Sequence, residues 1–206
     1  MGIRKWWALA PAVALALLVP LLGLGFYLRA GSPDIPAAQA QAMLPAQAAV
    51  NAGADDAVRR LRAHLERQPR DARGWVILAR LQADGDRFEE AAQAYAKALA
   101  VSSKVAADPA VWCEYADALG MARGGSLSGR PRELIDRALA LNPSHPKALE
   151  MAGSSEYERG DYAAALRHWR PLLAAQRPGS RAYAELAAAI ARSERLGATA
   201  VAAKRR

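Results

Sequence analysis

The chain has 206 residues, a formal charge of +8 and one cysteine, and about a quarter of its residues are alanine. Alanine favours helix, and two phenylalanines and six tyrosines are too few for a β-sandwich or a doubly wound sheet. A single cysteine excludes an intrachain disulfide and a four-cysteine zinc site. The three histidines are scattered, and no nucleophile–base pair or paired acids emerge. We therefore expect an all-α protein that is not an enzyme and holds no metal or cofactor.

The positive charge is concentrated near the two ends of the chain. Without six terminal basic residues the sequence is close to electroneutral; these are Arg4, Lys5, Arg29, Lys204, Arg205 and Arg206. A nucleic-acid-binding protein would instead gather its basic residues on one helix or face. The sequence therefore predicts no nucleic-acid partner.

An uncharged apolar segment spans residues 6–28, which is long enough to cross the hydrocarbon core of a membrane as a helix. Arg4 and Lys5 outnumber Arg29 on the other side, which predicts a cytoplasmic N-terminus and a periplasmic remainder in a Gram-negative host. A cleaved signal peptide is the alternative, but its apolar region is shorter and a small-x-small site follows it closely. We expect residues 1–29 to form an uncleaved single-pass anchor in the bacterial inner membrane.

Residues 30–53 combine several Pro and Gly with Ala and Gln, and they contain few large apolar side chains. Such a segment gains too little from burial to offset the entropy of ordering it, so it predicts a flexible linker. A helix is expected over residues 55–68, where Val58, Leu61 and Leu65 share one face and Pro69 ends the helix.

An internal repeat follows. Large residues recur every 37 residues at Trp75, Trp112 and Leu149, and small residues keep the same step at Ala79, Ala116 and Gly153. Such a period indicates stacked helical hairpins that cannot bury their apolar faces alone. The order within a unit fits the tetratricopeptide pattern, so three hairpins are expected. With the helix at 55–68 and a final one from a cap at Ser180 to Leu196, they predict eight helices in a right-handed superhelix over residues 54–197. A basic tail occupies residues 198–206.

The connections carry their own signals. The turns at residues 84–86 and 159–161 contain a glycine, which we expect to supply a positive φ. Unit two has a longer glycine-rich turn over residues 124–129, and Pro131 then occupies a first-turn site of the second helix. Unit one gains three residues in its connection to the next unit, residues 102–109.

These pieces together resemble the periplasmic tetratricopeptide domain of the cytochrome c maturation chaperones, the CcmI/CycH family and its relative NrfG. The segments that carry the resemblance are residues 62–69, 74–80, 115–119 with Gly124-Gly125, 137–149, 160–169 and 177–180. The similarity spans about residues 54–195. The chain departs from the family in having one apolar span where full-length members have two. It also has Gln82 where an aromatic residue is usual.

The resemblance implies a chaperone that holds apocytochrome c, by a C-terminal helical segment, and presents it to the haem lyase, whose subunits it would contact. Recognition would be helix-in-groove, with an amphipathic peptide on the concave surface. A general periplasmic tetratricopeptide scaffold for an envelope, secretion or respiratory complex is the alternative. A neighbouring haem lyase gene would distinguish the first from the second.

In such repeats the first helix of each hairpin lines the concave groove. Counting from the aligned small residues, the expected groove residues are Arg73, Val76, Arg80, Cys113, Asp117, Met121, Glu150, Ser154 and Tyr157. Cys113 either exchanges disulfides with the client or is a small core residue. Arg80 either binds a peptide carboxylate with both arms of its guanidinium or is simply solvated. Trp75, Trp112 and Trp169 are expected in the core.

Overall fold

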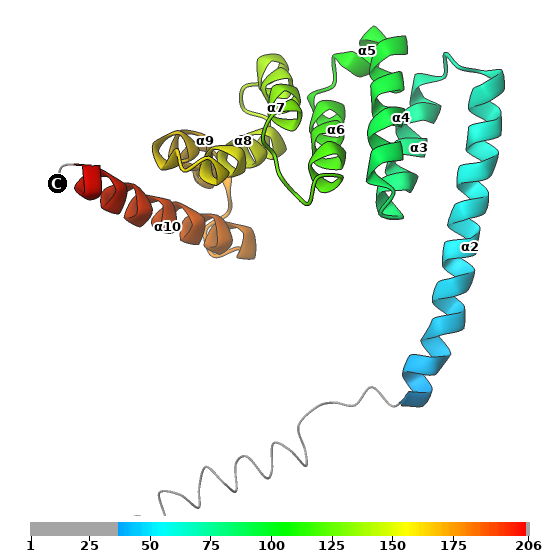
Figure 1. Cartoon of the computed structure of the whole chain (residues 1–206), viewed down its shortest axis with the longest axis horizontal. Coiled ribbons are helices and arrows are strands. Elements are labelled where there is room, and N and C mark those ends of the chain that lie inside the picture. Colours follow the sequence, from blue (N-terminus) through cyan, green and yellow to red (C-terminus); the bar gives the residue numbers. More distant parts are fainter. Residues whose placement is uncertain (1–36, 205–206) are drawn as a thin grey trace, which may run out of the picture. The chain divides into compact units, whose positions relative to one another are not determined.

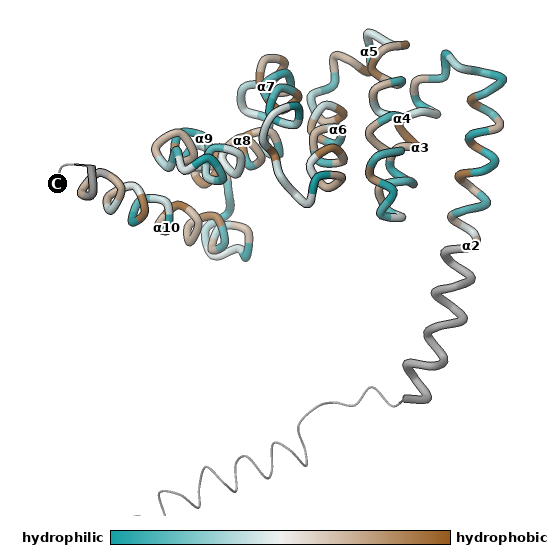
Figure 2. The backbone as a smooth tube through the Cα atoms, in the orientation of Figure 1, coloured by the Kyte–Doolittle hydropathy of each residue, from teal (hydrophilic) through white to brown (hydrophobic). Residues whose placement is uncertain are grey.

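The computed structural model describes residues 37–204, and all of their regular structure is helical (Figure 1). The chain divides after Val50 into two compact units, and the packing described below is that of the second unit. Hydrophobic and hydrophilic residues are mixed along the hairpin helices, as expected of helices that bury one face (Figure 2). The helices are α2 (Ala37–Arg67), α3 (Ala72–Asp84), α4 (Phe88–Val101), α5 (Ser103–Ala106), α6 (Pro109–Met121), α7 (Arg130–Leu141), α8 (Pro146–Glu158), α9 (Tyr162–Ala175) and α10 (Arg181–Lys204).

The three expected hairpins are present as α3–α4, α6–α7 and α8–α9, whose members pack against each other. Successive hairpins meet where α4 contacts α6 and α7 contacts α8, and α10 covers α9. The recurring small residues lie in these contacts, since Ala79 and Ala116 have no exposed surface and Gly153 is buried. Small side chains let the helices approach closely.

Side chains just before several helices accept hydrogen bonds from backbone amides of the first helical turn. Asp71 accepts a hydrogen bond from the Gly74 amide at 2.9 Å, and Asp161 accepts one from Ala164 at the same distance at the start of α9. Asp108 and His145 cap α6 and α8 in the same way. Such caps satisfy backbone donors that the helix itself leaves unpaired, which fixes where each helix begins.

Both ends of the predicted array differ from expectation. The helix expected from residue 55 begins at Ala37, so residues 37–53 of the expected linker are helical, because alanine and glutamine are good helix formers. At the other end, Ser180 caps the last helix through the Tyr183 amide, as expected. However, α10 continues through Gly197 to Lys204, because the alanines that follow favour helix.

The described part of the chain contains no helix that combines the length and apolarity needed to cross a bilayer. The expected anchor, residues 1–29, lies outside the described residues, as do residues 30–36 of the linker and the last two residues of the basic tail. The domain boundaries proposed from the sequence therefore stay predictions.

The turns follow the sequence signals with one correction. Gly160 has a φ of 77°, as expected for the α8–α9 turn, but in the α3–α4 turn the positive φ of 57° belongs to Asp86. Gly85 itself has a φ of −99°. Aspartate tolerates the left-handed region because its short polar side chain costs little there. The glycine-rich turn of unit two has positive φ at Gly124, Gly125 and Gly129, and Pro131 lies in the first turn of α7.

The extra residues of unit one form the short helix α5, whose N-terminus is capped by Ser102 through the Val105 amide at 3.3 Å. The Trp112 ring nitrogen donates to the Ala106 carbonyl at 2.8 Å, and the Trp75 ring nitrogen donates to Pro69 in the same way at 2.9 Å. Both rings are half-buried, so these two tryptophans join each first helix to the segment before it, whereas Trp169 is a core residue.

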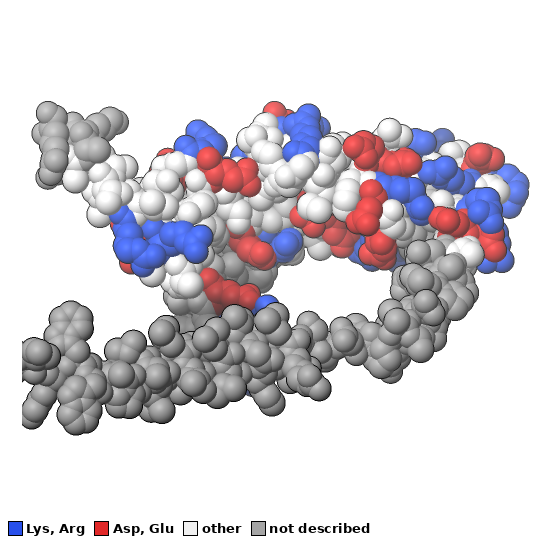
Figure 3. Space-filling model, turned by 60° about the horizontal axis from the view of Figure 1, so that its bottom comes forward, with Lys and Arg blue, Asp and Glu red and all other residues white. Residues whose placement is uncertain are grey.

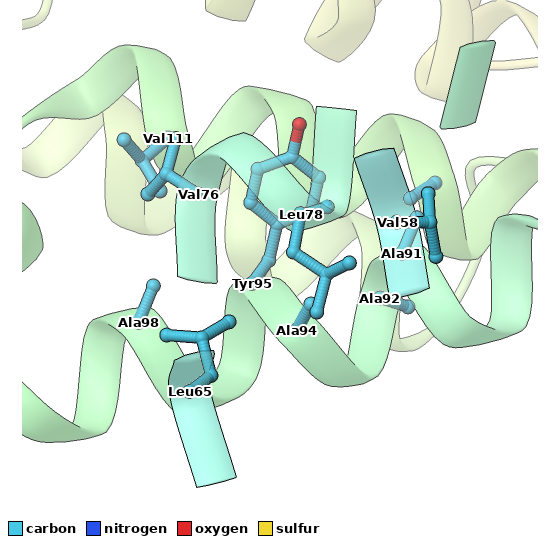
Figure 4. Packing of buried hydrophobic residues seen from close by; sticks show 12 residues of the cluster. Val58, Leu65, Val76, Leu78, Ala91, Ala92, Ala94, Tyr95, Ala98 and Val111 are labelled. Atoms are coloured by element: carbon cyan, nitrogen blue, oxygen red, sulfur yellow. The ribbon is translucent and has the colours of Figure 1, made fainter. Parts of the chain in front are cut away.

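Three hydrophobic clusters make up the core of the described residues. The first joins α2 to the first hairpin through Leu65, Leu78 and Tyr95 and reaches α6 at Val111 (Figure 4). The second lies among α6, α7 and α8, and the third joins α9 to α10. Gln82, at the position where the resembled family usually has an aromatic residue, is buried beside the first cluster. In the amide orientation that satisfies both groups, its nitrogen donates to the Glu90 carbonyl and its oxygen accepts from Arg62.

Candidate peptide-binding site

The nine expected groove residues lie on α3, α6 and α8, the first helices of the three hairpins, as the repeat pattern predicts. The structure does not bring them into one cavity among the described residues. Instead, the three residues of α3 line a cleft at the first hairpin, and two residues of α8 line a smaller pocket near α10.

The larger of these, called here the α3–α6 cleft, has a volume of about 590 Å³. It is bounded by α3, by the end of α4 with α5, and by the start of α6. Val76 and Val111 are buried and Val105 is half-buried, so they make an apolar floor. Ile77 and Val101 are large apolar residues left 51% and 40% exposed at the same place. Exposed branched side chains beside a buried apolar floor are typical of a binding site for an apolar group.

The charged residues of this cleft are unbalanced. Arg70, Arg73, Arg80 and Lys104 line it and are exposed, and the two acids that also line it are helix caps. The excess is local, because Lys and Arg lie interspersed with Asp and Glu on the face shown in Figure 3.

Of these two acids, Asp71 accepts from the Gly74 amide with one oxygen and contacts the His64 ring nitrogen at 3.0 Å with the other. The Gly74 hydrogen bond, and then the one from His64, lower the pKa of Asp71, so it stays ionised at neutral pH. Asp108 similarly accepts from Ala110 at 2.9 Å. Both carboxylates are thus engaged by their own chain rather than directed at the four cations.

Arg80 is the cation whose partner the structure identifies. Its Nε and one terminal nitrogen donate to the two carboxylate oxygens of Glu114 on α6, at 3.0 and 2.8 Å. The pair raises the pKa of Arg80 and lies beside Tyr95, whose pKa is also raised, chiefly by burial. The fork geometry expected for a peptide carboxylate is therefore occupied by a carboxylate of the chain itself. Arg80 lines the cleft, but a ligand must compete with Glu114 for it.

Cys113, expected to line the groove, is buried in the core instead. Its side chain is 2% exposed in the second core cluster, and its sulfur lies 3.8 Å from Nδ1 of His145. Burial raises the pKa of the thiol to about 11, so it is protonated at neutral pH and a poor nucleophile. The neighbouring residue, Glu114, faces the cleft-lining arginine instead. Cys113 is therefore a small core residue, which was one of its two expected roles, and its side chain does not line the groove.

The remaining expected residues fall into two groups. Asp117 and Met121 are exposed on α6 and line none of the described cavities. Glu150 and Ser154 line the smaller pocket, of about 300 Å³, between α8, α9 and α10, where the Ser154 hydroxyl donates to the Glu150 carbonyl at 3.0 Å.

Tyr157, the last of the expected groove residues, packs against other aromatic side chains. Its ring centroid lies 5.5 Å from that of Tyr162 in an edge-to-face arrangement and 5.9 Å from that of Trp169. Aromatic pairs at such distances contribute to packing, so this side chain belongs to the third core cluster.

Sequence reasoning missed Ile77, Val101, Lys104 and Glu114 as residues of the site or its rim. The insertion at residues 102–109 was the available signal, because added residues between hairpins must occupy new space. The Arg80–Glu114 pair had no such signal, since the two residues lie 34 positions apart. Within the described residues, no group of three or more His, Cys, Asp or Glu is placed to hold a metal ion.

Comparisons with known proteins agree with the fold and with the resemblance. Residues 32–183 match the family model of the cytochrome c-type biogenesis protein H TPR domain. The cytochrome c-type biogenesis proteins CycH of Bradyrhizobium diazoefficiens and Pseudomonas aeruginosa are 30% and 32% identical over 82% and 79% of this chain. The chain spans 45% and 38% of the length of these curated relatives, respectively.

Solved structures are similar in fold alone. MamA superposes with a TM-score of 0.61 at 14% identity, over 74% of this chain and 78% of MamA. The Sgt2 TPR domain from Aspergillus fumigatus gives 0.51 at 18% identity, over 66% of this chain and 83% of that domain. Such low identities carry information about the helical-hairpin architecture and not about ligands.

Proposed function

This chain belongs to the family of the cytochrome c-type biogenesis protein H TPR domain, and from that premise we propose that it is a periplasmic chaperone of cytochrome c assembly. In this role it holds apocytochrome c and presents it to the haem lyase, while residues 6–28 anchor it in the inner membrane. The observation that carries the proposal is the family match, which extends over all three hairpins.

The α3–α6 cleft supports the proposal by offering a place for a peptide. An amphipathic helix can insert apolar side chains between Ile77 and Val101, above the buried Val76, and leave its polar side toward solvent. An unfolded client must be ordered on binding, which costs free energy and keeps the affinity modest. Modest affinity suits a protein that must release its client to the next component.

The test is calorimetric titration of the full chain, in mild detergent, with an apocytochrome c and with the same cytochrome carrying its haem. We expect binding of the apo form with a Kd of about 1 μM or tighter, which is about 8 kcal/mol of binding free energy, and loss of binding in the holo form because its helix is folded away. Absence of binding to either form would favour a general periplasmic scaffold instead.

A further inference from the structure

The α3–α6 cleft holds three cations for which the described residues supply no acidic partner. Arg70, Arg73 and Lys104 form no ion pair within the part of the chain that the structure describes, in contrast to Arg80 with Glu114. The acids that line the cleft, Asp71 and Asp108, each accept a hydrogen bond from a backbone amide, and the second oxygen of Asp71 contacts His64. The cleft therefore combines an apolar floor with an unneutralised positive rim.

We propose that this cleft selects client segments by charge: it takes an amphipathic helix whose apolar side chains enter the floor and whose side-chain carboxylates face Arg70, Arg73 and Lys104. This inference rests on the proposed function and narrows it to one chemical class of client. Carboxylates about two helical turns apart lie on the same side of a helix, as Arg73 and Arg80 do on α3 with a spacing of seven residues, so the two sets can be matched along their lengths. Opposite potentials of this kind decide which partner binds more than how tightly it binds.

Glu114 is the residue that sets the strength of this selection. It occupies both arms of the Arg80 guanidinium in the way a client carboxylate would, so it competes with the client from within the chain. Removing its charge leaves Arg80 in place at the cleft and adds a fourth available cation. Affinity for an acidic helix then rises, whereas affinity for a basic helix does not.

The experiment uses two labelled peptides with amidated C-termini, each about three helical turns long, so that no terminal carboxylate contributes. Both carry Leu at helical spacing on one face, and they differ only in having Glu or Lys beside that face. Fluorescence anisotropy with the full chain in mild detergent gives the two Kd values. We expect the Glu peptide to bind about tenfold tighter than the Lys peptide, with the difference shrinking as salt is added.

Three variants separate the contributions. Arg73→Glu should weaken binding of the Glu peptide about fivefold, because it replaces one attraction with a repulsion. Glu114→Gln should strengthen it about threefold. Arg177→Glu, in the exposed connection between α9 and α10 and away from the cleft, makes the same charge change as Arg73→Glu and should leave the Kd unchanged. Circular dichroism melting checks that each variant is folded.

Equal binding of the two peptides, or equal effects of the Arg73 and Arg177 variants, would overturn the proposal. Weaker binding of the Glu peptide by a folded Glu114→Gln variant would overturn the role of Glu114. If the apocytochrome binds while the Glu peptide does not, charge selection is wrong and the chaperone role stands. If neither binds, both proposals fall.

Discussion

At the scale of single residues, the rotational position of a residue on its helix decides whether its side chain lies in the core or at the surface. Cys113 and Glu114 are adjacent on α6, yet one is buried in the second core cluster and the other pairs with Arg80 beside the cleft. Successive helical residues are rotated by about 100°, so a shift of one position exchanges core for surface. Residues that permit close helix packing depend on side-chain size instead of rotation.

Gly153 is the clearest of these residues. A Cβ atom at this position would lie 2.1 Å from Nε1 of Trp169, and the ring is held there by its hydrogen bond to the Glu150 carbonyl at 3.1 Å. We expect Gly153→Ala to lower the free energy of unfolding by about 2 kcal/mol, because the buried ring must move away. Chemical denaturation followed by Trp fluorescence measures this.

Gly53→Ala is the matched control, since a Cβ there meets nothing within 4 Å and the residue lies within helix α2. This change should be neutral or slightly stabilising, because alanine is the better helix former. Equal stability of the Gly153→Ala and Gly53→Ala proteins would show that the Trp169 ring can move aside without lowering the free energy of unfolding.

At the scale of elements, the connections between helices do more than join the hairpins. The segment before α6 folds into α5 and forms one wall of the cleft, and Trp112 holds it through the Ala106 carbonyl. Trp75 makes the equivalent hydrogen bond one repeat earlier, to Pro69. The large residue of the repeat pattern thus fixes the segment that precedes its helix as well as filling space.

Trp112→Phe tests this role. The ring remains apolar but its N–H is lost, and the Ala106 carbonyl loses its donor, so we expect a fall of about 1 kcal/mol in the free energy of unfolding. Relative to the unchanged protein, hydrogen exchange in the variant should speed up more at the amides of α5 than at those of the other helices. Trp75→Phe is the comparison, with a smaller effect expected because its hydrogen bond is solvent-exposed. Uniform loss of protection over all helices would argue against a local anchor.

At the scale of the whole molecule, the hairpins of the part of the chain that the structure describes pack mainly on their neighbours. The first core cluster is built from α2, α3 and α4 with a contribution from α6, and the third joins α9 to α10. Stability in such an array is close to a sum of local terms, so its two ends need not unfold together. The α3–α6 cleft belongs to the first hairpin and its junction with the second.

Ile190→Ala should therefore destabilise the C-terminal end of the array without destabilising the first hairpin. The residue is buried between α10 and α9, and its truncation should cost about 2 to 3 kcal/mol at that end. Hydrogen exchange should show lost protection in α9 and α10 with protection in α3 and α4 retained, and the affinity for the Glu peptide should change little. Equal loss in all helices would mean that the array unfolds as one cooperative unit.

By itself, the sequence determined the number of hairpins, their order, the small residues at helix crossings and the family, because these depend on local periodicity and on short motifs. The extents of α2 and α10 were underestimated, since Pro and Gly were given more weight than the helix propensity of the alanines around them. The expected groove residues lie on the first helices of the hairpins, as the repeat pattern predicts, but the side chain of Cys113 faces the core. The Arg80–Glu114 pair joins residues 34 positions apart, and the buried Cys113 contacts His145, 32 positions away. Contacts over such separations are set by how the hairpins stack, so the sequence alone did not predict them. That stacking also opens the cleft, so its shape and charge were decided only by the tertiary structure.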